Sequence, residues 1–381
     1  MEWKEDILGN VLEVKYGKDH KKLAEGQYPV YGSGGLMRYV DSKLYDGPSI
    51  LIPRKGTLNN IMFVESPFWT VDTMFWTIIN TDKIDPKFLF YSICKRDFAS
   101  MNVGSAVPSM TVRILNDIQI SYPKNLDDQR RIASILSSLD RKIELNNKIN
   151  ADLEEMAQAI FKNWFVDFEP FKDGKFVDSE LGMIPEGWKV GGLDEIADVV
   201  GGSTPSKAKP EYYTQKGIAW LTPKDLSNHP AVYTSRGEID ITEEGYNSTS
   251  TKLMPKGTIL FTSRAPIGYI SIAQNDICTN QGFKSLVPKK AGTCFLYCFL
   301  KYVTPEIENK STGSTFKEAS GALMKSLQVI MPDQKVFEEF EEIVSPLFAR
   351  IESLEKENSR LSLLRDTLLP RLMSGELEVP E

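Results

Sequence analysis

Apolar residues spaced three and four apart dominate residues 125–166, and this spacing predicts one long amphipathic helix. The residues on this face are Ile132, Leu136, Leu139, Ile143, Leu153, Met156, Ile160 and Trp164. The stretch contains neither Gly nor Pro, and Asn125 followed by Asp127 and Asp128 is typical of a helix N-terminus. At 1.5 Å per residue the helix would be roughly 60 Å long, longer than a compact domain needs. We therefore expect it to hold two parts of the chain apart.

A second helical stretch, residues 333–372, follows a seven-residue repeat that is typical of coiled coils. One seam contains Phe340, Leu347, Leu354, Leu361 and Leu368, and the other contains Phe337, Val344, Ile351, Asn358 and Leu372. Pro346 interrupts this stretch, so we expect either a kink or a fresh helix with Ser345 as its N-cap. In the first stretch Asn146 and Asn150 interrupt the apolar face, and polar residues in such a seam set its register.

The segments that precede the two helical stretches repeat one another. Residues 3–17 match residues 188–202 at an offset of 185, and the apolar positions of both copies fit a helical face, so we expect a helix in each. Further along the offset is 209, as these matched pairs show: Ile50 and Ile259, Lys55 and Arg264, Gly104-Ser105 and Gly313-Ser314, Ile118 and Leu327. The second copy is therefore longer by 24 residues, inserted around residues 207–247.

The order globular, helix, globular, helix predicts an α+β fold produced by tandem duplication. We expect two globular domains, each a mixed β-sheet with helices followed by a long helix, with the two helices paired as an antiparallel coiled coil. The expected boundaries are 1–124 and 188–332 for the domains, 125–168 and 333–381 for the helical spacers, and 169–187 for a connector. The residues expected to pair the helices are Ile132, Leu139, Ile143, Leu153, Ile160, Leu347, Leu354, Leu361 and Leu368.

The charge is distributed unevenly along the 381 residues. The net charge of −7 argues superficially against a nucleic-acid partner, but segments 127–170 and 333–381 carry −3 and −6, whereas 1–126 and 188–332 carry +1 and +3. The globular halves could therefore approach a polyanion through a local basic patch. Because the chain has no long apolar run, no signal-like start and only four irregularly spaced cysteines, we expect a soluble cytoplasmic protein with reduced thiols and no membrane partner.

Residues that could form a catalytic or metal site are nearly absent. The two histidines, His20 and His229, have no Cys or carboxylate at ligand spacing. Cys294 and Cys298 could share a helical face but lack two further ligands, and free cysteines on an apolar helix usually belong to a core. The glycine-rich segment 32–35 precedes no Lys-Ser/Thr, so a turn is the better interpretation. We therefore expect no catalytic residue and no metal site in this chain.

Polar residues that follow the predicted strands are suited to reading nucleic acid. Arg, Asn and Gln form paired hydrogen bonds with base edges, whereas Lys and Ser/Thr-rich turns hold phosphates. The candidates are Arg54, Lys55, Asn59, Asn60, Ser105 and Arg113 in the first half, and Lys224, Arg264, Asn280, Gln281, Lys284, Ser314, Thr315 and Lys317 in the second. A polar loop residue is solvated by default, so each candidate alone is weak evidence of DNA contact.

This layout resembles the DNA-specificity (S) subunits of type I restriction-modification enzymes, and the resemblance covers the whole chain. The segments that carry it are GSAVPSMT and GSTFKEAS in the globular halves, DDQRRIASILSSLDRKIELN and AIFKNWFVDFEPF in the central helix, SELGMIPEGWKV before the second half, and LLPRLMSGEL at the end. One segment departs from the family pattern: the second helix begins DQKVFEEFEEIV, where the family more often shows a Glu-Gln-Arg/Lys-Ile-like start.

The resemblance implies that each globular half is a target-recognition domain that reads one part of a split double-stranded DNA site. The helices would set the gap and dock two modification subunits, which methylate adenine using S-adenosylmethionine. Restriction subunits would add translocation and cleavage with ATP and Mg²⁺, so this chain would bind no cofactor itself. Two other hypotheses remain. One is an autonomous enzyme acting on DNA, which the missing catalytic residues disfavour. The other is a coiled-coil protein–protein assembly scaffold that does not bind DNA.

Overall fold

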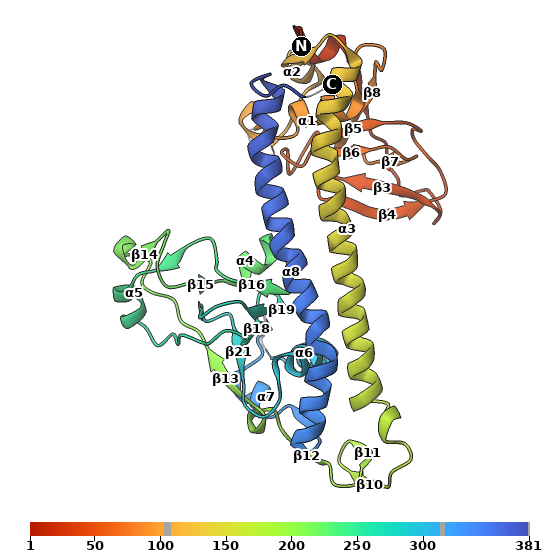
Figure 1. The fold of residues 1–381 in the computed structure, drawn as a ribbon. Helices are drawn as coiled ribbons and strands as arrows, with labels where there is room; N and C mark the ends of the chain where they lie inside the picture. The colour runs from red at the N-terminus through yellow and green to blue at the C-terminus, as the bar shows by residue number, and fades with distance from the viewer. Residues whose placement is uncertain (103–107, 313–316, 380–381) are drawn as a thin grey trace. The chain divides into compact units, whose positions relative to one another are not determined.

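The structure, a computed structural model, describes residues 1–102, 108–312 and 317–379. Two helices of 40 residues follow the two globular halves: α3 Leu126–Phe165 and α8 Gln334–Met373. The chain divides into two compact units, unit 1 being Met1–Glu144 with Ser359–Glu381 and unit 2 being Leu145–Asn358. Each unit therefore contains one globular half and parts of both long helices, whose ribbons are labelled in Figure 1.

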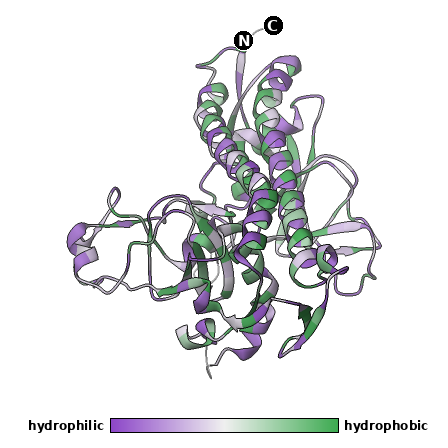
Figure 2. Ribbon diagram, turned by 60° about the horizontal axis from the view of Figure 1, so that its bottom comes forward, coloured by the Kyte–Doolittle hydropathy of each residue, from purple (hydrophilic) through white to green (hydrophobic). Residues whose placement is uncertain are grey.

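The prediction of one long helix after each globular half is confirmed. Asn125 Oδ1 accepts a hydrogen bond from the Asp127 N–H at 2.9 Å, as expected of a residue that caps the first turn of α3. Figure 2 shows hydrophobic and hydrophilic residues on different sides of the helical ribbons. The long helices are amphipathic, and each unit buries the apolar side of its own segments.

Helix α8 continues through Pro346, so the prediction of a fresh helix start at Ser345 is wrong. An interior proline costs about 3 kcal/mol, because it removes one backbone hydrogen bond and crowds the preceding turn. Val344 and Phe348 lie on either side of it and are 0% and 1% exposed. Burial of this apolar face in unit 2 offsets the cost and keeps the turn helical.

Residues 3–16 and 189–201 are not α-helices, which corrects the prediction made for both copies. The first copy consists of β1 Trp3–Ile7, a 3-10 turn Leu8–Asn10 and β2 Leu12–Tyr16, and the second of β12 Lys189–Gly192, a 3-10 turn Leu193–Glu195 and β13 Ala197–Gly201. An apolar spacing of three fits a short 3-10 turn as well as a helix. The strands depend on partners far along the chain, which local periodicity does not reveal.

The duplication inferred from the sequence recurs in the backbone hydrogen bonds. In unit 1 the Leu8 N–H donates to Ile118 O at 2.8 Å, and in unit 2 the Leu193 N–H donates to Leu327 O at 2.9 Å. The two pairs are related by the offsets of 185 and 209 found in the sequence. The short helices α2 Val112–Asn116 and α7 Gly321–Lys325 also differ by 209. The two copies therefore share one scaffold.

Unit 1 is built on three sheets. A four-stranded sheet has the order β2-β8-β5-β6, a three-stranded sheet has the order β4-β3-β7, and β1 pairs with β9 in antiparallel register. The strands not yet placed are β3 Tyr28–Gly32, β4 Gly35–Val40, β5 Ser49–Pro53, β6 Met62–Val64, β7 Trp69–Thr70, β8 Met74–Ile79 and β9 Gln119–Pro123. Helix α1 Pro86–Ile93 and a 3-10 turn Ala99–Met101 complete the unit.

Unit 2 is built on a five-stranded sheet with the order β13-β21-β18-β19-β16, and the pairs β10-β11, β12-β22, β14-β17 and β15-β20 surround it. The further strands are β10 Phe176–Ser179, β11 Gly182–Pro185, β14 Tyr213–Thr214, β15 Trp220–Leu221, β16 Tyr233–Thr234, β17 Asp240–Ile241, β18 Ile259–Ser263, β19 Ile267–Ala273, β20 Cys278–Thr279, β21 Lys284–Pro288 and β22 Gln328–Met331. The helical elements are α4 Pro223–Asn228, α5 Glu243–Asn247 and α6 Thr293–Lys310, with 3-10 turns at Glu169–Phe171 and Pro210–Tyr212.

Within unit 2 the segments of α3 and α8 run antiparallel. Asn146 contacts Asn358 near one end of the segments, and the rings of Phe165 and Phe340 lie 5.1 Å apart near the other. Residue numbers thus rise along α3 while those of its partners fall along α8. The Phe295 ring of α6 lies 4.9 Å from Phe165, so the helices share the core of the globular half. A supercoiled seam between them stays a prediction.

The residues expected to pair the helices are all at least half-buried. Ile132 and Leu354 are fully buried, and the half-buried ones are Leu139, Ile143, Leu153, Ile160, Leu347, Leu361 and Leu368. Met156, placed on the apolar face by the sequence, is 52% exposed, whereas Ala157 and Phe161 are buried. The buried stripe of α3 thus moves by one residue in its second half, because a straight helix repeats every 3.6 residues rather than every 3.5.

Candidate nucleic-acid interface

The structure brings three of the predicted residues of the second half together in one pocket of about 910 Å³ in unit 2. Lys224, Arg264 and Asn280 line it, beside the aromatic rings of Tyr213 and Trp220. Lys224 comes from α4, and Arg264 and Asn280 directly follow strands β18 and β20. We call this the unit 2 pocket. It has the polar, cationic and aromatic lining that is suited to nucleic acid.

A capping box holds the helix that carries Lys224. Asp225 Oδ2 accepts hydrogen bonds from the N–H and the hydroxyl of Thr222, both at 2.7 Å, and Asp225 Oδ1 accepts from the Glu238 N–H at 2.9 Å. Pro223 occupies the first turn, where its missing N–H costs nothing. Both carboxylate oxygens of Asp225 are therefore used to build the pocket wall.

Arg264 and Lys284 share one carboxylate. Glu318 Oε2 lies 3.5 Å from Arg264 Nη1, and Glu318 Oε1 lies 3.4 Å from Lys284 Nζ. The Arg264 side chain is 36% exposed and that of Lys284 is 17% exposed. Two cations held by one anion leave a local positive charge, and the contact with Glu318 restricts the directions in which the guanidinium can point.

The other predicted residues of the second half that the structure describes do not line this pocket. Gln281 is exposed, and its side-chain oxygen contacts the Thr204 hydroxyl. Lys317 is exposed, and its Nζ donates to Glu308 O at 3.2 Å. Ser314 and Thr315 fall outside the described residues, as does Ser105 of the first half.

In unit 1 the predicted cations follow β5. The Arg54 guanidinium lies over the Tyr16 ring at 5.7 Å from its centroid, and the backbone O of Arg54 accepts from the Met110 N–H at 2.9 Å. The Lys55 side chain is exposed. Arg113 lies on α2, where its side chain is 92% exposed and its Nε is 3.9 Å from Asp117. Lys55 and Arg113 are thus accessible to a phosphate backbone.

The two asparagines predicted in unit 1 have structural hydrogen bonds. Asn59 accepts from the Ala99 N–H at 2.9 Å and donates to Asp97 at 3.2 Å. Asn60 Nδ2 donates to Ser33 O at 2.8 Å. These contacts tie the loop after β5 to two other segments of the unit. We therefore interpret both amides as groups that shape the loop rather than as free readers of bases.

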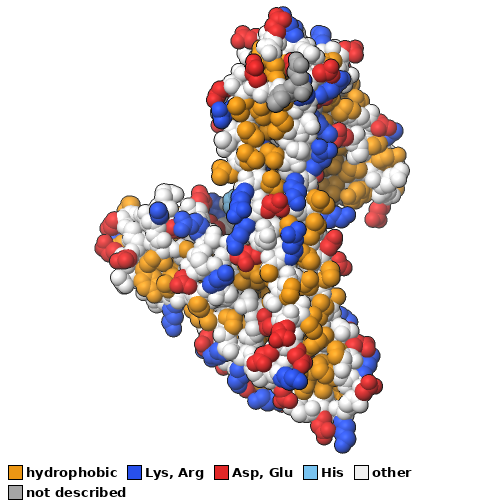
Figure 3. All heavy atoms as spheres, in the orientation of Figure 1, with side chains coloured by type: hydrophobic (Ala, Val, Ile, Leu, Met, Phe, Trp, Pro, Cys, Tyr) orange, Lys and Arg blue, Asp and Glu red, His pale blue; other side chains and the backbone are white. Residues whose placement is uncertain are grey.

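Sequence reasoning missed several residues of the unit 2 pocket. The side chains not singled out are Lys207, Tyr213, Gln215, Trp220 and Glu238, which all fall in the part of the second half that the repeat identified as an insertion. The two lysines of the segment SKAKPEYY were the available signal, because they combine positive charge with aromatic neighbours. On the face drawn in Figure 3, Lys and Arg side chains lie among acidic ones rather than in one continuous field.

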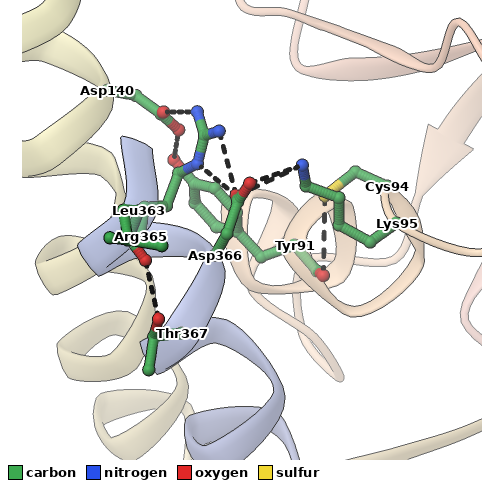
Figure 4. Close-up of polar contacts among 8 residues, drawn as sticks. All are labelled: Tyr91, Cys94, Lys95, Asp140, Leu363, Arg365, Asp366 and Thr367. Atoms are coloured by element: carbon green, nitrogen blue, oxygen red, sulfur yellow. Dashed lines mark hydrogen bonds and ion pairs between the residues drawn. The ribbon is translucent and has the colours of Figure 1, made fainter. Parts of the chain in front are cut away.

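An ion network fixes the globular half of unit 1 to its helix segments (Figure 4). Asp140 of α3 accepts from the Tyr91 hydroxyl of α1 at 2.5 Å and lies 2.6 Å from Arg365 Nη1 of α8. Asp366 contacts Arg365 at 3.0 Å and Lys95 at 3.2 Å. Burial, and then the hydrogen bond to Asp140, raises the pKa of Tyr91. This network holds the globular half of unit 1 on its helix segments.

In unit 2 two carboxylates of α8 connect the globular half to the long helix. Glu355 of α8 accepts from the Val232 and Tyr233 N–H groups at 2.7 and 3.0 Å. Burial raises the pKa of Glu355 to about 7, and the two backbone hydrogen bonds oppose this shift. Glu341 of α8 accepts from the N–H groups of Cys294 and Phe295 at 3.2 and 2.8 Å. A carboxylate at the N-terminus of α6 accepts from backbone N–H groups that have no partner within the helix. Its negative charge also interacts favourably with the positive end of the helix dipole.

Within the ranges 1–102, 108–312 and 317–379, no three His, Cys, Asp or Glu residues lie close enough together to hold a metal. The four cysteines are free, and Cys278, Cys294 and Cys298 are buried. Burial raises the pKa of the Cys278 thiol to about 11 and raises the pKa values of Cys294 and Cys298 as well. None of these three thiols is therefore placed as a nucleophile. None of the described helices has the length and apolarity needed to span a bilayer.

Comparison with protein families identifies the chain. The family model described as "Type I restriction modification DNA specificity domain" matches residues 1–155 and again residues 185–363. The chain belongs to this family. The two matched ranges correspond to the two copies of the duplication, so each copy is one specificity domain followed by part of a long helix.

Several members of the specificity-domain family with curated names are similar to this chain. The MjaIX specificity subunit of Methanocaldococcus jannaschii is 40% identical over 190 residues, which is 49% of this chain and 44% of that protein. The chain thus spans less than half the length of that relative. The HindI specificity subunit of Haemophilus influenzae is 26% identical over 386 residues, covering 83% of each chain.

A solved structure of a family member supports the fold. The crystal structure of a type I restriction-modification S subunit from M. genitalium superposes with a TM-score of 0.61. It is 19% identical and covers 97% of this chain and 96% of its own. The prediction of an α+β protein with two tandem domains and two long helices is therefore confirmed.

Proposed function

We propose that this protein is the DNA sequence-specificity subunit of a type I restriction-modification complex. The observation that carries the proposal is the second match of the specificity-domain model, which coincides with the structural duplication. One reading domain in each half fits a protein that recognises a bipartite site on double-stranded DNA. The cationic lining of the unit 2 pocket gives one of these domains a candidate contact surface.

The long helices would set the distance between the two half-sites and dock two modification subunits. Exposed apolar residues on α3 and α8 support docking, because large apolar side chains left in solvent on a helix often mark a protein contact. Leu145 and Met156 of α3 are 52% exposed, and Leu363 of α8 is 70% exposed. Restriction subunits would join the same complex.

The chemistry of such a complex belongs to the partner subunits. Methylation of adenine requires S-adenosylmethionine, and translocation and cleavage require ATP and Mg²⁺. This chain contributes recognition and geometry, and it would bind none of these cofactors. Its role in the reaction is to place the modification subunits at the correct sites on the DNA.

Exchange of one domain tests this proposal. Residues 1–124 are replaced by the equivalent segment of a relative, the chain is assembled with its modification subunits, and the methylated adenines of the host genome are sequenced. We expect one half-site to change and the other to remain. The reciprocal exchange of residues 188–332 is the matched control and should change the other half-site. Methylation at unchanged sites in both chimaeras, or no binding of duplex DNA by the complex, would favour the scaffold that does not bind DNA.

A further inference from the structure

Two half-buried side chains that line the unit 2 pocket, Arg264 and Asn280, carry hydrogen-bond donors. Lys284 shares the carboxylate of Glu318 with Arg264. The exposed polar side chains of the lining are Lys207, Gln215, Lys224 and Glu238. A side chain with restricted motion loses less conformational entropy when it binds than a fully exposed one does.

Among the described residues, no hydrogen bond uses the Nδ2 donor of Asn280, so this donor is open to a ligand. Its Oδ1 accepts from the Gly282 N–H at 2.8 Å, and a backbone N–H cannot accept, so the orientation of the amide is fixed. Gly282 is required here, because a Cβ on it would lie 2.8 Å from Pro223 Cγ and 3.0 Å from Asn280 Oδ1. The hydrogen bond from Gly282 therefore fixes the orientation of the Asn280 amide, and Nδ2 is the donor that it presents to a ligand.

Arg264 also has unused donors. Its contact with Glu318 involves Nη1, at 3.5 Å, and no other described residue contacts Nε or Nη2, so both are open to a ligand. A backbone hydrogen bond joins the two segments that carry this ion pair: the Ala319 N–H donates to Ser263 O at 2.9 Å. Glu318 thus orients the guanidinium from a neighbouring segment without neutralising the site, since Lys284 shares the same carboxylate.

The acidic part of the lining makes a phosphate an unfavourable occupant. Glu238 and Asp225 lie in the same pocket, and a phosphate would meet their negative charge. The edge of a base carries no net charge and would not be repelled. Trp220 and Tyr213 donate to Ser203 O at 3.1 Å and Pro205 O at 2.6 Å, so both rings are held as walls.

We infer that Arg264, oriented by Glu318, reads a guanine in the major groove of the half-site bound by unit 2. Guanine presents two neighbouring acceptors, O6 and N7, which match the fork of an arginine, whereas adenine places a donor beside N7. Asn280 supplies a further donor at the same pocket. This inference rests on the proposed function and adds the class of base that is read.

The corresponding position of unit 1 has different properties. Lys55 matches Arg264 in the repeat, but it is exposed, and no carboxylate of the described residues forms an ion pair with it. A lysine is a mobile point charge that suits a phosphate rather than a paired contact with a base. We therefore confine the inference to one half-site.

DNA with 7-deazaguanine tests the inference, because this base lacks only the N7 acceptor. The methylated motif is first identified by sequencing, and each guanine of the half-site of unit 2, on either strand, is then replaced in turn. Binding by the complex of this chain with its modification subunits is measured by competition. We expect one replacement to weaken binding roughly five- to 100-fold.

Two variants assign this effect to the pocket. Arg264→Gln should bind the normal and the 7-deazaguanine DNA equally, while it still discriminates at the half-site of unit 1, which shows that it is folded. For Glu318→Gln, replacement by 7-deazaguanine should weaken binding less than it does for the unaltered chain. Lys252→Gln, a change at an exposed lysine of unit 2 that does not line the pocket, is the control and should remain as sensitive as the unaltered chain.

Three results would overturn the inference and leave the proposed function intact. The half-site of unit 2 could lack guanine, no replacement could weaken binding, or Arg264→Gln could be as sensitive as the unaltered chain. A complex that binds no specific duplex at all would instead overturn the proposed function. The two failures are therefore distinguishable.

Discussion

Asn146 of α3 donates a hydrogen bond to Asn358 of α8, with 2.8 Å between Nδ2 and Oδ1. The same Nδ2 lies 2.9 Å from Glu357 Oε2, and Asn146 is fully buried. Asn358 in turn donates to Asn147 at 2.8 Å. A polar contact in a largely apolar seam favours one register, because another register would bury the Asn146 Nδ2 donor without an acceptor.

Asn146→Ala should therefore destabilise the protein by roughly 1–3 kcal/mol, since it removes two hydrogen bonds and leaves a cavity in the seam. Urea unfolding of the variant and of the unaltered chain measures the difference. Lys148→Ala, at an exposed position on the same turn, is the control and should change the free energy of unfolding by less than about 0.5 kcal/mol. Equal losses for both variants would show that the buried contact has no special role.

The network around Asp140 predicts that breaking a half-buried ion pair lowers the free energy of unfolding more than breaking an exposed one. Asp140→Ala leaves the Tyr91 hydroxyl without its acceptor and removes one of the two carboxylates that contact Arg365, and we expect a loss of roughly 2–4 kcal/mol. Asp127→Ala breaks the exposed pair with Arg130 and should cost less than about 1 kcal/mol. Thermal or urea unfolding separates these cases, and similar costs would contradict the structural role of the network.

Glu355 predicts a pH dependence of stability. Its pKa is raised by burial from 4.5 to about 7, so the folded protein holds a proton that the unfolded chain releases. The resulting stabilisation is present in full below pH 4.5 and is lost as the pH rises through 7. Nearby Glu154 and Glu352 contribute to the raised pKa.

Glu355→Gln should remove this dependence, because the amide does not titrate. Between pH 5 and pH 8 the unaltered chain should lose about 1–3 kcal/mol relative to the variant, as measured by urea unfolding at each pH. Glu339→Gln, at an exposed position on the same helix, is the control and should follow the unaltered chain. A constant difference between Glu355→Gln and the unaltered chain across this range would contradict the prediction.

The long helices were predictable because α3 and α8 bury one face each, and such a face leaves a periodic trace in the sequence. The segments at Trp3 and Lys189 were not predictable in this way. Their strands are stabilised by partners 59 or more residues away, for example Leu12 beside Ile79. A short apolar run has the same local pattern in either structure, and the distant partner decides between them.

The site was predictable in part for a related reason. Arg264 and Asn280 directly follow buried strands, and loops at strand ends are where a scaffold presents functional side chains. Asn59 has the same kind of position in unit 1, but its amide is used to hold Ala99 and Asp97. Which polar loop residue stays free depends on the hydrogen bonds of the folded loop, and the sequence does not contain this information explicitly.

The last prediction concerns the distance between the half-sites and rests on the proposed function. Because α3 and α8 run antiparallel within unit 2, a longer spacer requires a matched insertion in both helices. Four residues are added after Lys148 and four after Asn358, beside the Asn146 contact. Four residues add roughly 6 Å to each helix and turn it by about 400°, so the apolar faces stay nearly in phase. The longer helices should remain folded.

This addition corresponds to one or two base pairs of DNA at about 3.4 Å each. The methylated motif should keep both half-sites while the gap between them grows by one or two base pairs. Matched two-residue insertions are the control, because they rotate each following stripe by about 200° and should abolish methylation. Sequencing of methylated adenines measures both outcomes. An unchanged gap with full activity of the four-residue variant would show that the helices do not set the spacing.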